Sequence, residues 1–485
     1  MNPILAVAPN YHLDTLLAAQ KDAQLRDGIP SAEVRIDRLE RCIGLLVDNR
    51  RAFEAALLAD FGSRSPTATG MLDLFSSIHA LKHARRHLRK WMKPEKRPTT
   101  PRILGWVGAG ARVLYQPKGV VGIMAPWNAP VSMVFAPLAG IFAAGNRAMV
   151  KPSELTPATA ATIAEQVARH FDPEELTVAT GGVEIAQAFS ELPFDHLIFT
   201  GATSIGRRVM QSAARNLVPV TLELGGKSPV IIGRDVKLSL AAARIMGGKL
   251  INGGQICVSP DHLFVPETQQ DELVEHLKIA AARMFPTIID NPNYTSIINP
   301  RHYQRIMDYL SDAEDKGARR ITINPAEEDF SSDKARALRK IPPTLLFGVT
   351  RDMKIMQDEI FGPVLPILTY RDIGEPIQAI NASPRPLALY YFGSDAAERD
   401  RVLRQTVSGG VTVNDVMVHV GQEDMPFGGV GPSGMGAYHG IDGFREFSHR
   451  KGVYLQLKTD AKQVEETRPP YGPFVFKFLD KEIRR

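Results

Sequence analysis

The chain has 485 residues, and its 58 basic residues exceed its 53 acidic residues by only five. A chain of this length is too long for one ordinary hydrophobic core, so two or three domains are expected. Hydrophobic residues at 44% and charged residues at 23% are ordinary values for a globular protein. The small excess of positive charge gives no reason to expect a nucleic-acid partner.

Cysteine content and the N-terminal sequence bear on location. Cys42 and Cys257 are too few for a disulfide framework, which favours a reducing compartment. Residues 1–10 lack the basic region of a secretion signal and contain two prolines. The apolar stretch 120–144 is interrupted by three prolines, so it predicts a buried strand, a loop and the start of a helix. We therefore expect a cytoplasmic protein with no integral membrane segment.

The first half of the chain changes from helical patterning to alternating strands and helices. Apolar spacing predicts helices over 36–59 and 72–92, then a Pro- and Lys-rich break at 93–102. Residues 112–119 are typical of a strand and turn that could form a hairpin arm. Strands are then predicted at 120–124, 148–150, 196–199 and 220–224, with helices at 137–144, 157–170 and 204–216. Thr156 and Pro157 suit the cap and the first residue of the helix over 157–170.

The alternation restarts after Gly225 and Gly226. Strands are predicted at 230–232, 263–265, near 345, and at 365–370, 389–392 and 411–414, with helices at 238–250, 269–284 and 301–315. Such alternation indicates parallel sheets covered by helices on both faces, and the first half suits a nucleotide-binding domain. The predicted class is α/β, with two doubly wound domains and a small β arm.

Two residues attract attention as reactive groups. Cys257 follows Gly253 and Gly254, whose unhindered backbone would let a ligand approach the sulfur. The alternative is that Cys257 is a small buried hydrophobe. Glu223 stands between two leucines at a strand end, 34 residues before Cys257 (257 minus 223). Desolvation there would raise its pKa toward the range of a general base.

Three further motifs follow predicted strands. Asn128 lies on a loop held by prolines, where its amide could donate to an oxyanion, or could simply shape a turn. Lys151 and Glu154 could grip ribose hydroxyls, or form a solvated turn. The segment from Gly201 to Gly206 opens a helix that could hold a pyrophosphate, although it departs from the usual dinucleotide fingerprint and is equally typical of a turn.

Seven motifs in order resemble the aldehyde dehydrogenase superfamily over nearly the whole chain. They are Pro126-Trp127-Asn128, Lys151-Pro152-Ser153-Glu154, Phe199-Thr200-Gly201 through Gly206, Glu223-Leu224-Gly225-Gly226-Lys227, Gly254-Gln255-Ile256-Cys257, Glu359-Ile360-Phe361-Gly362-Pro363 and Pro426-Phe427-Gly428-Gly429. Each is weak alone, but their shared order makes coincidence very improbable. The resemblance favours the catalytic interpretation of Cys257.

The resemblance implies a mechanism and a role for each residue. Cys257 would attack the aldehyde carbon, Asn128 and the Cys257 amide would hold the oxyanion, and Glu223 would activate water to hydrolyse the thioester. An NAD cofactor is implied, with NADP as an alternative, and no metal. The implied cofactor contacts are Lys151 and Glu154 at the adenosine ribose, Gly201 and Gly206 at the pyrophosphate, Glu359 and Phe361 at the nicotinamide, and Thr200 and Trp127 along the site.

The resemblance also implies domain roles. Residues 1–98 and 117–224 would bind the cofactor, 225–415 would form the catalytic domain, and 99–116 with 416–485 would form the oligomerisation arm and the C-terminal segment. A homodimer is therefore expected. The aromatic and basic segment 471–481 is predicted to pack on the body or a second subunit, with peripheral membrane binding as the alternative.

Substrate and cofactor preference rest on finer features. The ending from Pro426 onward resembles the branch that handles fatty and aromatic aldehydes, so coniferyl aldehyde or a medium- or long-chain aldehyde is expected. Small side chains at Ala129 and Ala136 would leave room for a ring. The Glu154 carboxylate would repel a 2′-phosphate, which predicts NAD over NADP. Ala202 stands where related chains often have serine, which puts that pyrophosphate contact in doubt.

Two other interpretations remain open from the sequence. One is a CoA-acylating or semialdehyde-specific dehydrogenase, against which a water-activating Glu223 argues. The other is a catalytically silent protein on the same scaffold, against which the intact set of Asn128, Glu223 and Cys257 argues.

Overall fold

The chain forms two compact units, Met1–Trp91 with Pro117–Ser448, and Met92–Gln116 with His449–Arg485. The computed structural model describes residues 9–100, 102–106, 108–459 and 462–484. Residues 1–8, which make up most of the stretch examined for a secretion signal, lie outside the described part. Within that part, no helix is both long and apolar enough to cross a membrane.

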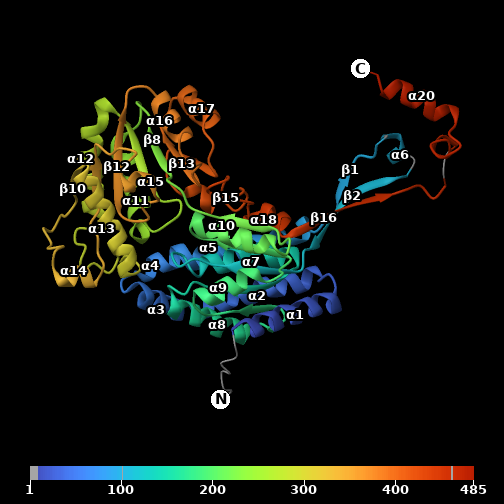
Figure 1. The fold of residues 1–485 in the computed structure, drawn as a ribbon, viewed down its shortest axis with the longest axis horizontal. Coiled ribbons are helices and arrows are strands. Elements are labelled where there is room, and N and C mark those ends of the chain that lie inside the picture. The colour runs from blue at the N-terminus through green and yellow to red at the C-terminus, as the bar shows by residue number, and fades with distance from the viewer. Residues whose placement is uncertain (1–8, 101, 107, 460–461, 485) are drawn as a thin grey trace, which may run out of the picture. The chain divides into compact units, whose positions relative to one another are not determined.

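The first sheet of the larger unit has the strand order β15-β7-β6-β3-β4-β5. Figure 1 labels its edge strand β15 and several of the helices of this unit. All neighbouring strands are parallel except β15, which is antiparallel to β7. The order runs outward in both directions from β3, which is the arrangement that creates a binding crevice where the order reverses. The strands are β3 (Val120–Met124), β4 (Arg147–Lys151), β5 (Leu176–Val178), β6 (His196–Thr200), β7 (Val220–Glu223) and β15 (Gly434–Met435).

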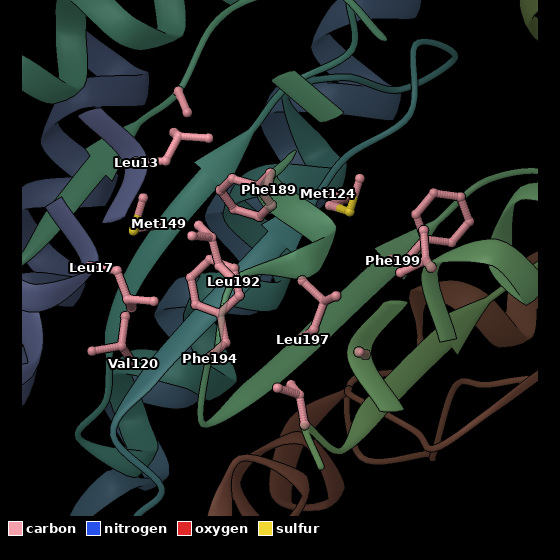
Figure 2. Packing of buried hydrophobic residues seen from close by; sticks show 14 of the residues in the cluster. Leu13, Leu17, Val120, Met124, Met149, Phe189, Leu192, Phe194, Leu197 and Phe199 are labelled. Carbon is pink, nitrogen blue, oxygen red and sulfur yellow. The ribbon is translucent and has the colours of Figure 1, made fainter. Parts of the chain in front are cut away.

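Helices cover both faces of this sheet, and β3, β4 and β6 are buried along their whole length. One face packs against α1 (Pro9–Asp27), α9 (Val183–Glu191) and α10 (Thr203–Ala214). Figure 2 shows Leu13 and Leu17 of α1 and Phe189 of α9 gathered over strand residues such as Met149 and Leu197. Helix α7 (Ser132–Ala144) contacts β3 and β4, and α2 (Ala32–Asp48) and α5 (Ser76–Trp91) pack on α7.

The second sheet has the order β10-β11-β12-β9-β8-β13-β14 and is parallel except for β10. Its strands are β8 (Pro229–Ile232), β9 (His262–Pro266), β10 (Arg319–Thr322), β11 (Thr344–Phe347), β12 (Val364–Tyr370), β13 (Ala388–Phe392) and β14 (Gly410–Val413). Its longer helices are α11 (Leu238–Leu250), α12 (Gln270–Met284), α13 (Pro300–Asp315), α16 (Gly374–Asn381) and α17 (Ala396–Gln405). Separate apolar clusters join α13 to β11 and β12, and α16 and α17 to the central strands.

The smaller unit contains a three-stranded sheet of order β1-β2-β16. Strand β1 (Glu95–Arg97) lies within the stretch expected to be a break, and it pairs antiparallel with β2 (Gly110–Pro117). The third strand is β16 (Ser448–Leu455), and the unit also contains α6 (Arg102–Trp106), α19 (Lys462–Glu465) and α20 (Pro473–Glu482). No described side chain of α20 is buried, and its aromatic residues Phe474, Phe476 and Phe478 are 42%, 56% and 40% exposed.

Residues 416–448 were expected with the arm, but they are grouped with the larger unit. The reason is that β15 pairs with β7, and α18 (Gly440–Glu446) packs on α7 and α5. The helix predicted over 36–59 is divided at Asn49, where α2 ends and α3 (Arg50–Phe61) begins.

The start of α8 (Pro157–His170) corrects another expectation. Thr156 is the residue before the helix, but its side chain does not cap the helix. Asp60 of α3 does so instead, since its two carboxylate oxygens accept hydrogen bonds from the Ala158 and Thr159 amides at 2.9 and 2.8 Å. A cap supplied by a residue 98 positions away is invisible to local sequence analysis.

Candidate active site

Residues singled out from the sequence gather at one edge of the first sheet. Trp127 and Asn128 follow β3, Lys151 ends β4, Thr200 ends β6 and Glu223 ends β7. The carboxyl ends of parallel strands meet at the same edge, and Thr200 and Glu223 are direct register partners there. The topology thus assembles these residues around the point where the strand order reverses.

The loop before Cys257 has an unusual backbone. After α11, Asn252, Gly253 and Gly254 have φ angles of 52°, 63° and 76°, the left-handed region in which side chains are strained. A Cβ on Gly254 would lie 2.4 Å from the Gly362 carbonyl oxygen. The glycine therefore lets this loop lie against the segment that holds Glu359 and Phe361.

Glu223 is buried, with 2% of its surface exposed, and its Oε1 has no hydrogen-bond partner. Burial raises the pKa of this carboxyl well above its usual value, as its place between two leucines predicts. A buried carboxyl with an unused oxygen is poorly stabilised as a structural group, so its position calls for a functional explanation.

The Cys257 thiol is close enough to two carboxyl groups to be influenced by them. Burial raises the pKa of Cys257, and the charges of Glu359 and Glu223 raise it further. The thiol is therefore protonated at neutral pH in the chain alone, and forming the nucleophilic thiolate requires a base to remove its proton. The Glu223 carboxylate, which is close enough to act on the pKa of this thiol, could accept that proton.

Asn128 joins the two halves of the site. Its Nδ2 donates to the Gln255 carbonyl oxygen at 3.1 Å, two residues before Cys257. The Asn128 side chain is mostly buried, with 8% of the residue exposed. Because an amide nitrogen has two hydrogens, one remains for a further acceptor such as an oxyanion.

Lys151 and Glu154 lie together after β4. The Lys151 Nζ donates to the Pro152 carbonyl oxygen at 2.7 Å and lies 3.5 Å from Glu154 Oε2. Burial lowers the pKa of Lys151, while Glu154 raises it in part. The carboxylate of Glu154 is more exposed than the lysine, which suits a group that meets a ligand hydroxyl.

The Gly201 to Gly206 segment consists of a two-residue turn after β6 and the first turn of α10. A Cβ on Gly201 would lie 2.6 Å from the Phe199 ring, and one on Gly206 would lie 2.6 Å from a Leu224 methyl group. Ala202 precedes α10 and offers no side-chain cap, so the first amides of the helix are left for another acceptor. This arrangement fits a pyrophosphate bound through backbone amides.

Aromatic rings connect the loop after β3 with the segment before β12. Trp127 makes an edge contact with Phe361, with ring centroids 5.3 Å apart, and lies 5.1 Å from the His302 ring. Burial raises the pKa of Glu359 to about 8, the charge of Asp261 adds to this, and the Gly226 amide opposes it. Phe361 therefore lies beside Trp127, which follows β3, and Glu359 lies beside Gly226, which follows β7. One ligand could contact both segments.

Sequence reasoning missed an aromatic cluster beside the thiol. Phe427 stacks on His439 at 5.0 Å and contacts Tyr438 at 5.9 Å. Burial raises the pKa of the Tyr438 hydroxyl, as do the charges of Glu223 and Cys257. The signal in the sequence is the pair Tyr438-His439, which follows the motif Pro426-Phe427-Gly428-Gly429. In the sequence alone, that motif carries the family resemblance, whereas the pair has no assigned role.

Within the described residues, no group of three or more His, Cys, Asp and Glu side chains is arranged to hold a metal ion. The groups described above that could react are a thiol, a carboxyl group and an amide.

Comparison with known proteins identifies the family. Residues 10–453 match the model described as the aldehyde dehydrogenase family. The chain belongs to this family. It is thus an NAD(P)-dependent aldehyde dehydrogenase, an oxidoreductase that converts an aldehyde to the acid, as the seven motifs predicted.

The similar proteins agree in fold and in chemistry. A probable coniferyl aldehyde dehydrogenase of Caulobacter vibrioides is 58% identical, with 100% of both chains covered. A coniferyl aldehyde dehydrogenase of a Pseudomonas species is 50% identical over 96% of this chain and 95% of its own. Among solved structures, the substrate-bound AldH of Staphylococcus aureus has a TM-score of 0.89 and 34% identity, with 100% of both chains covered. A Mycobacterium tuberculosis aldehyde dehydrogenase complexed with NAD+ has a TM-score of 0.83 and 28% identity over 94% of this chain and 92% of its own. The predicted α/β class is confirmed.

Proposed function

We propose that the chain oxidises its aldehyde through a thioester on Cys257, with Glu223 as the general base and Asn128 as an oxyanion donor. The observation that supports this most directly is the buried Glu223 carboxyl, which has an unpaired oxygen and acts on the pKa of the Cys257 thiol. An isolated buried cysteine would need neither the base nor the strained loop beside it.

Each step uses a group described above. Glu223 accepts the thiol proton while Cys257 Sγ bonds to the carbonyl carbon, and the new oxyanion accepts hydrogen bonds from Asn128 Nδ2 and the Cys257 amide. The bound cofactor supplies a hydride acceptor, and loss of hydride from the carbon leaves the thioester. Glu223 next loses the thiol proton to solvent and is again a carboxylate. It then accepts a proton from water as the water oxygen attacks the thioester carbon, and breaking of the C–S bond releases the acid and leaves the Cys257 thiolate.

The proposed cofactor residues are Lys151, Glu154, Thr200, Gly201, Gly206, Trp127, Glu359 and Phe361, and the preferred cofactor is NAD. Glu154 supports this preference because its carboxylate would accept hydrogen bonds from a free 2′-hydroxyl and would repel a 2′-phosphate. We expect Glu154→Gln to narrow the preference for NAD, measured as the ratio of kcat/KM for NAD and NADP. Glu165→Gln, an exposed carboxylate on α8 paired with Arg169, is the control. Equal kcat/KM values for the two cofactors in the original chain would contradict the proposal.

The proposed substrate is an aromatic aldehyde such as coniferyl aldehyde, with medium- and long-chain aldehydes as the alternative. Support comes from the names of the two bacterial relatives above and from the aromatic cluster of Phe427, Tyr438 and His439 near the thiol. The small side chain of Ala129 follows Asn128, and Ala136 is buried in α7. A panel of coniferyl aldehyde, hexanal and acetaldehyde tests this, and a clear preference for acetaldehyde would contradict it.

The experiment that tests the function as a whole is a spectrophotometric assay of NADH formation across that panel, with and without CoA. We expect the acid to form without CoA, because a water-activating Glu223 favours hydrolysis. Formation of acyl-CoA would instead support the CoA-acylating alternative. Absence of NADH with every aldehyde would support a silent scaffold.

The domain roles, the homodimer and the cytoplasmic location are also proposed. Residues 1–98 and 117–224 would bind the cofactor, 225–415 would form the catalytic domain, and the arm would mediate dimerisation. The smaller unit supports dimerisation because β16 is an edge strand with most of its residues exposed. Two free cysteines support a reducing compartment. Light scattering of the purified chain and fractionation of cells would test these points.

A further inference from the structure

A fully buried ion pair lies behind the loop that contains Asn128. Arg64 Nη2 is 2.5 Å from Asp73 Oδ2, and neither side chain has any exposed surface. The pair is distant in sequence from every motif that led to the family. Its remaining hydrogen bonds show what it does in the structure.

The ion pair holds the loop at both ends. Arg64 Nη1 donates to the main-chain oxygen of Asn128 at 3.1 Å. Asp73 Oδ1 accepts from the amides of Val131 and Ser132 at 3.0 and 3.2 Å. Two side chains bonded to each other therefore fix the loop at Asn128 and at its junction with α7, where Val131 precedes the helix and Ser132 begins it.

The arrangement depends on an irregular helix. Asp73 lies within η1 (Gly70–Phe75), a π-helical segment between α4 (Pro66–Thr69) and α5. Such segments are frequently found at functional sites. The guanidinium of Arg64 also stacks over the Phe61 ring, 4.7 Å from its centroid.

A second set of bonds ties this loop to the one that holds the nucleophile. Asn252 Nδ2 donates to the Asn128 main-chain oxygen at 3.0 Å and to the Gln255 main-chain oxygen at 3.2 Å. The Asn128 oxygen thus accepts hydrogen bonds from Arg64 and Asn252, while the Asn128 side chain donates to Gln255. The orientation of the Asn128 amide relative to Cys257 follows from these contacts.

We propose that Arg64 and Asp73 are positioning residues for the oxyanion site, which hold the 128–132 loop so that Asn128 Nδ2 faces the carbonyl oxygen bound at Cys257. This inference rests on the proposed role of Asn128. Neither residue touches the substrate, and both act through the loop. A displacement of about 1 Å in such a donor can lower the rate about 100-fold.

Stability alone does not account for the pair. Removing two charges from water is costly, and apolar residues of similar size often replace a buried ion pair with no loss of stability. Apolar residues could not form the hydrogen bonds that the pair forms with three main-chain groups. Arg64 donates to the Asn128 oxygen, and Asp73 accepts from the amides of Val131 and Ser132.

The test is a kinetic cycle between the ion pair and Asn128. We expect the double variant Arg64→Met/Asp73→Leu to lower kcat about 10- to 100-fold, with KM for NAD unchanged. Tm should fall as well, because the buried Val131 and Ser132 amides lose their acceptor, so the comparison with the Asn128→Ala background carries the test. In the Asn128→Ala background the same two substitutions are expected to cause no further fall in kcat, because the group they position is gone. Arg38→Met is the control, since Arg38 is a buried arginine that pairs with Glu175 at 2.9 Å and does not contact the loop.

Each outcome decides the matter. An unchanged kcat in the double variant, or an equal fall in both backgrounds, would overturn the inference. A full kcat in Asn128→Ala alone would instead refute the proposed oxyanion role. If the double variant does not fold, Arg64→Lys keeps a cation beside Asp73 and loses the bond to Asn128. It is expected to lower kcat with Tm unchanged, and an unchanged kcat there would overturn the inference equally.

Discussion

The two cysteines of the chain have similar thiols in very different places. Burial raises the pKa of both Cys42 and Cys257. Cys42 lies on the regular helix α2 with no exposed surface, whereas Cys257 is partly exposed and follows three residues with positive φ. The comparison teaches that the pKa of a thiol does not identify a nucleophile, because the neighbouring acid, amide and backbone decide whether it can react.

The largest expected difference between the two regions is in turnover. We expect Cys257→Ala to lower kcat by about four orders of magnitude or more, because the thioester can no longer form. Cys42→Ala should leave kcat unchanged and lower stability by about 1 kcal/mol or more through the cavity that it creates. Steady-state NADH formation and thermal unfolding of both variants measure this. A comparable loss of kcat in the two variants would show that Cys257 is not the nucleophile that distinguishes the two cysteines.

The base should separate the two halves of the reaction at Cys257. We expect Glu223→Gln to lower steady-state kcat about 100- to 1,000-fold, because the thioester is no longer hydrolysed efficiently. Water is a much weaker acid than a thiol, so hydrolysis should slow more than formation of the thioester, although Glu223 serves both steps. With excess aldehyde and NAD, the expected signature is therefore a thioester that accumulates on Cys257 and is detected by mass spectrometry of the intact protein. Because burial raises the pKa of Glu223, its base form grows as the pH rises through that raised pKa, so kcat of the original chain should rise with pH and that of the variant should rise less. A variant that turns over at the original rate would exclude Glu223 as the base.

Alkylation compares the two sulfurs directly. Because the pKa of Cys257 is raised, its thiolate fraction at neutral pH is small and grows about tenfold with each pH unit. Iodoacetamide should therefore label Cys257 about 100-fold faster at pH 9 than at pH 7. Cys42 should stay unlabelled until the chain unfolds, since its surface is fully covered. Peptide mapping identifies the labelled cysteine. Labelling of Cys42 before Cys257 would show that the reagent does not reach the two sulfurs as differently as proposed.

Two glycines give the smallest effects, and of opposite sign. Gly254→Ala places a Cβ 2.4 Å from the Gly362 oxygen at a φ of 76°, so we expect a loss of stability of about 2 kcal/mol or more. Gly44→Ala, two residues from Cys42 on α2, meets only Asp48 at 3.9 Å and should stabilise the chain by about 0.5–1 kcal/mol. Denaturant unfolding measures both. If both substitutions change the free energy of unfolding in the same direction, the loop and the helix tolerate an added side chain equally, and the comparison fails.

The sequence predicted those parts of the structure whose causes are local. Helices α8 and α11 and strand β3 have the predicted bounds. For α8, the apolar periodicity and Pro157 at the first position agree, although the predicted Thr156 cap was wrong. Helices α1 and α9 and strands β5 and β10 were missed. Strands β5 and β10 have only three and four residues, and α1 has almost no amphipathic pattern. The division of α2 from α3 at Asn49 was missed as well, because apolar residues continue across it.

The candidate site shows the same limit. Cys257, Glu223 and Asn128 were each marked by their immediate neighbours, and the family resemblance supplied the order that joined them. Arg64 contacts Asn128 across 64 positions, and Asp60 caps α8 across 98. Such partners are set by tertiary packing, so no local pattern in one sequence could have indicated them.

The anchoring of Glu223 determines how its carboxyl group can move. Its backbone pairs with Thr200 on one side and Gly434 on the other, and its carbonyl oxygen accepts from the Gly201 amide at 3.0 Å. With the main chain held by neighbours on both sides, the carboxyl can travel between sulfur and water only by rotating about its own side-chain bonds. Such rotations are much faster than the movement of a loop. Proton delivery in this protein should therefore be insensitive to solvent viscosity, even where release of the products is not.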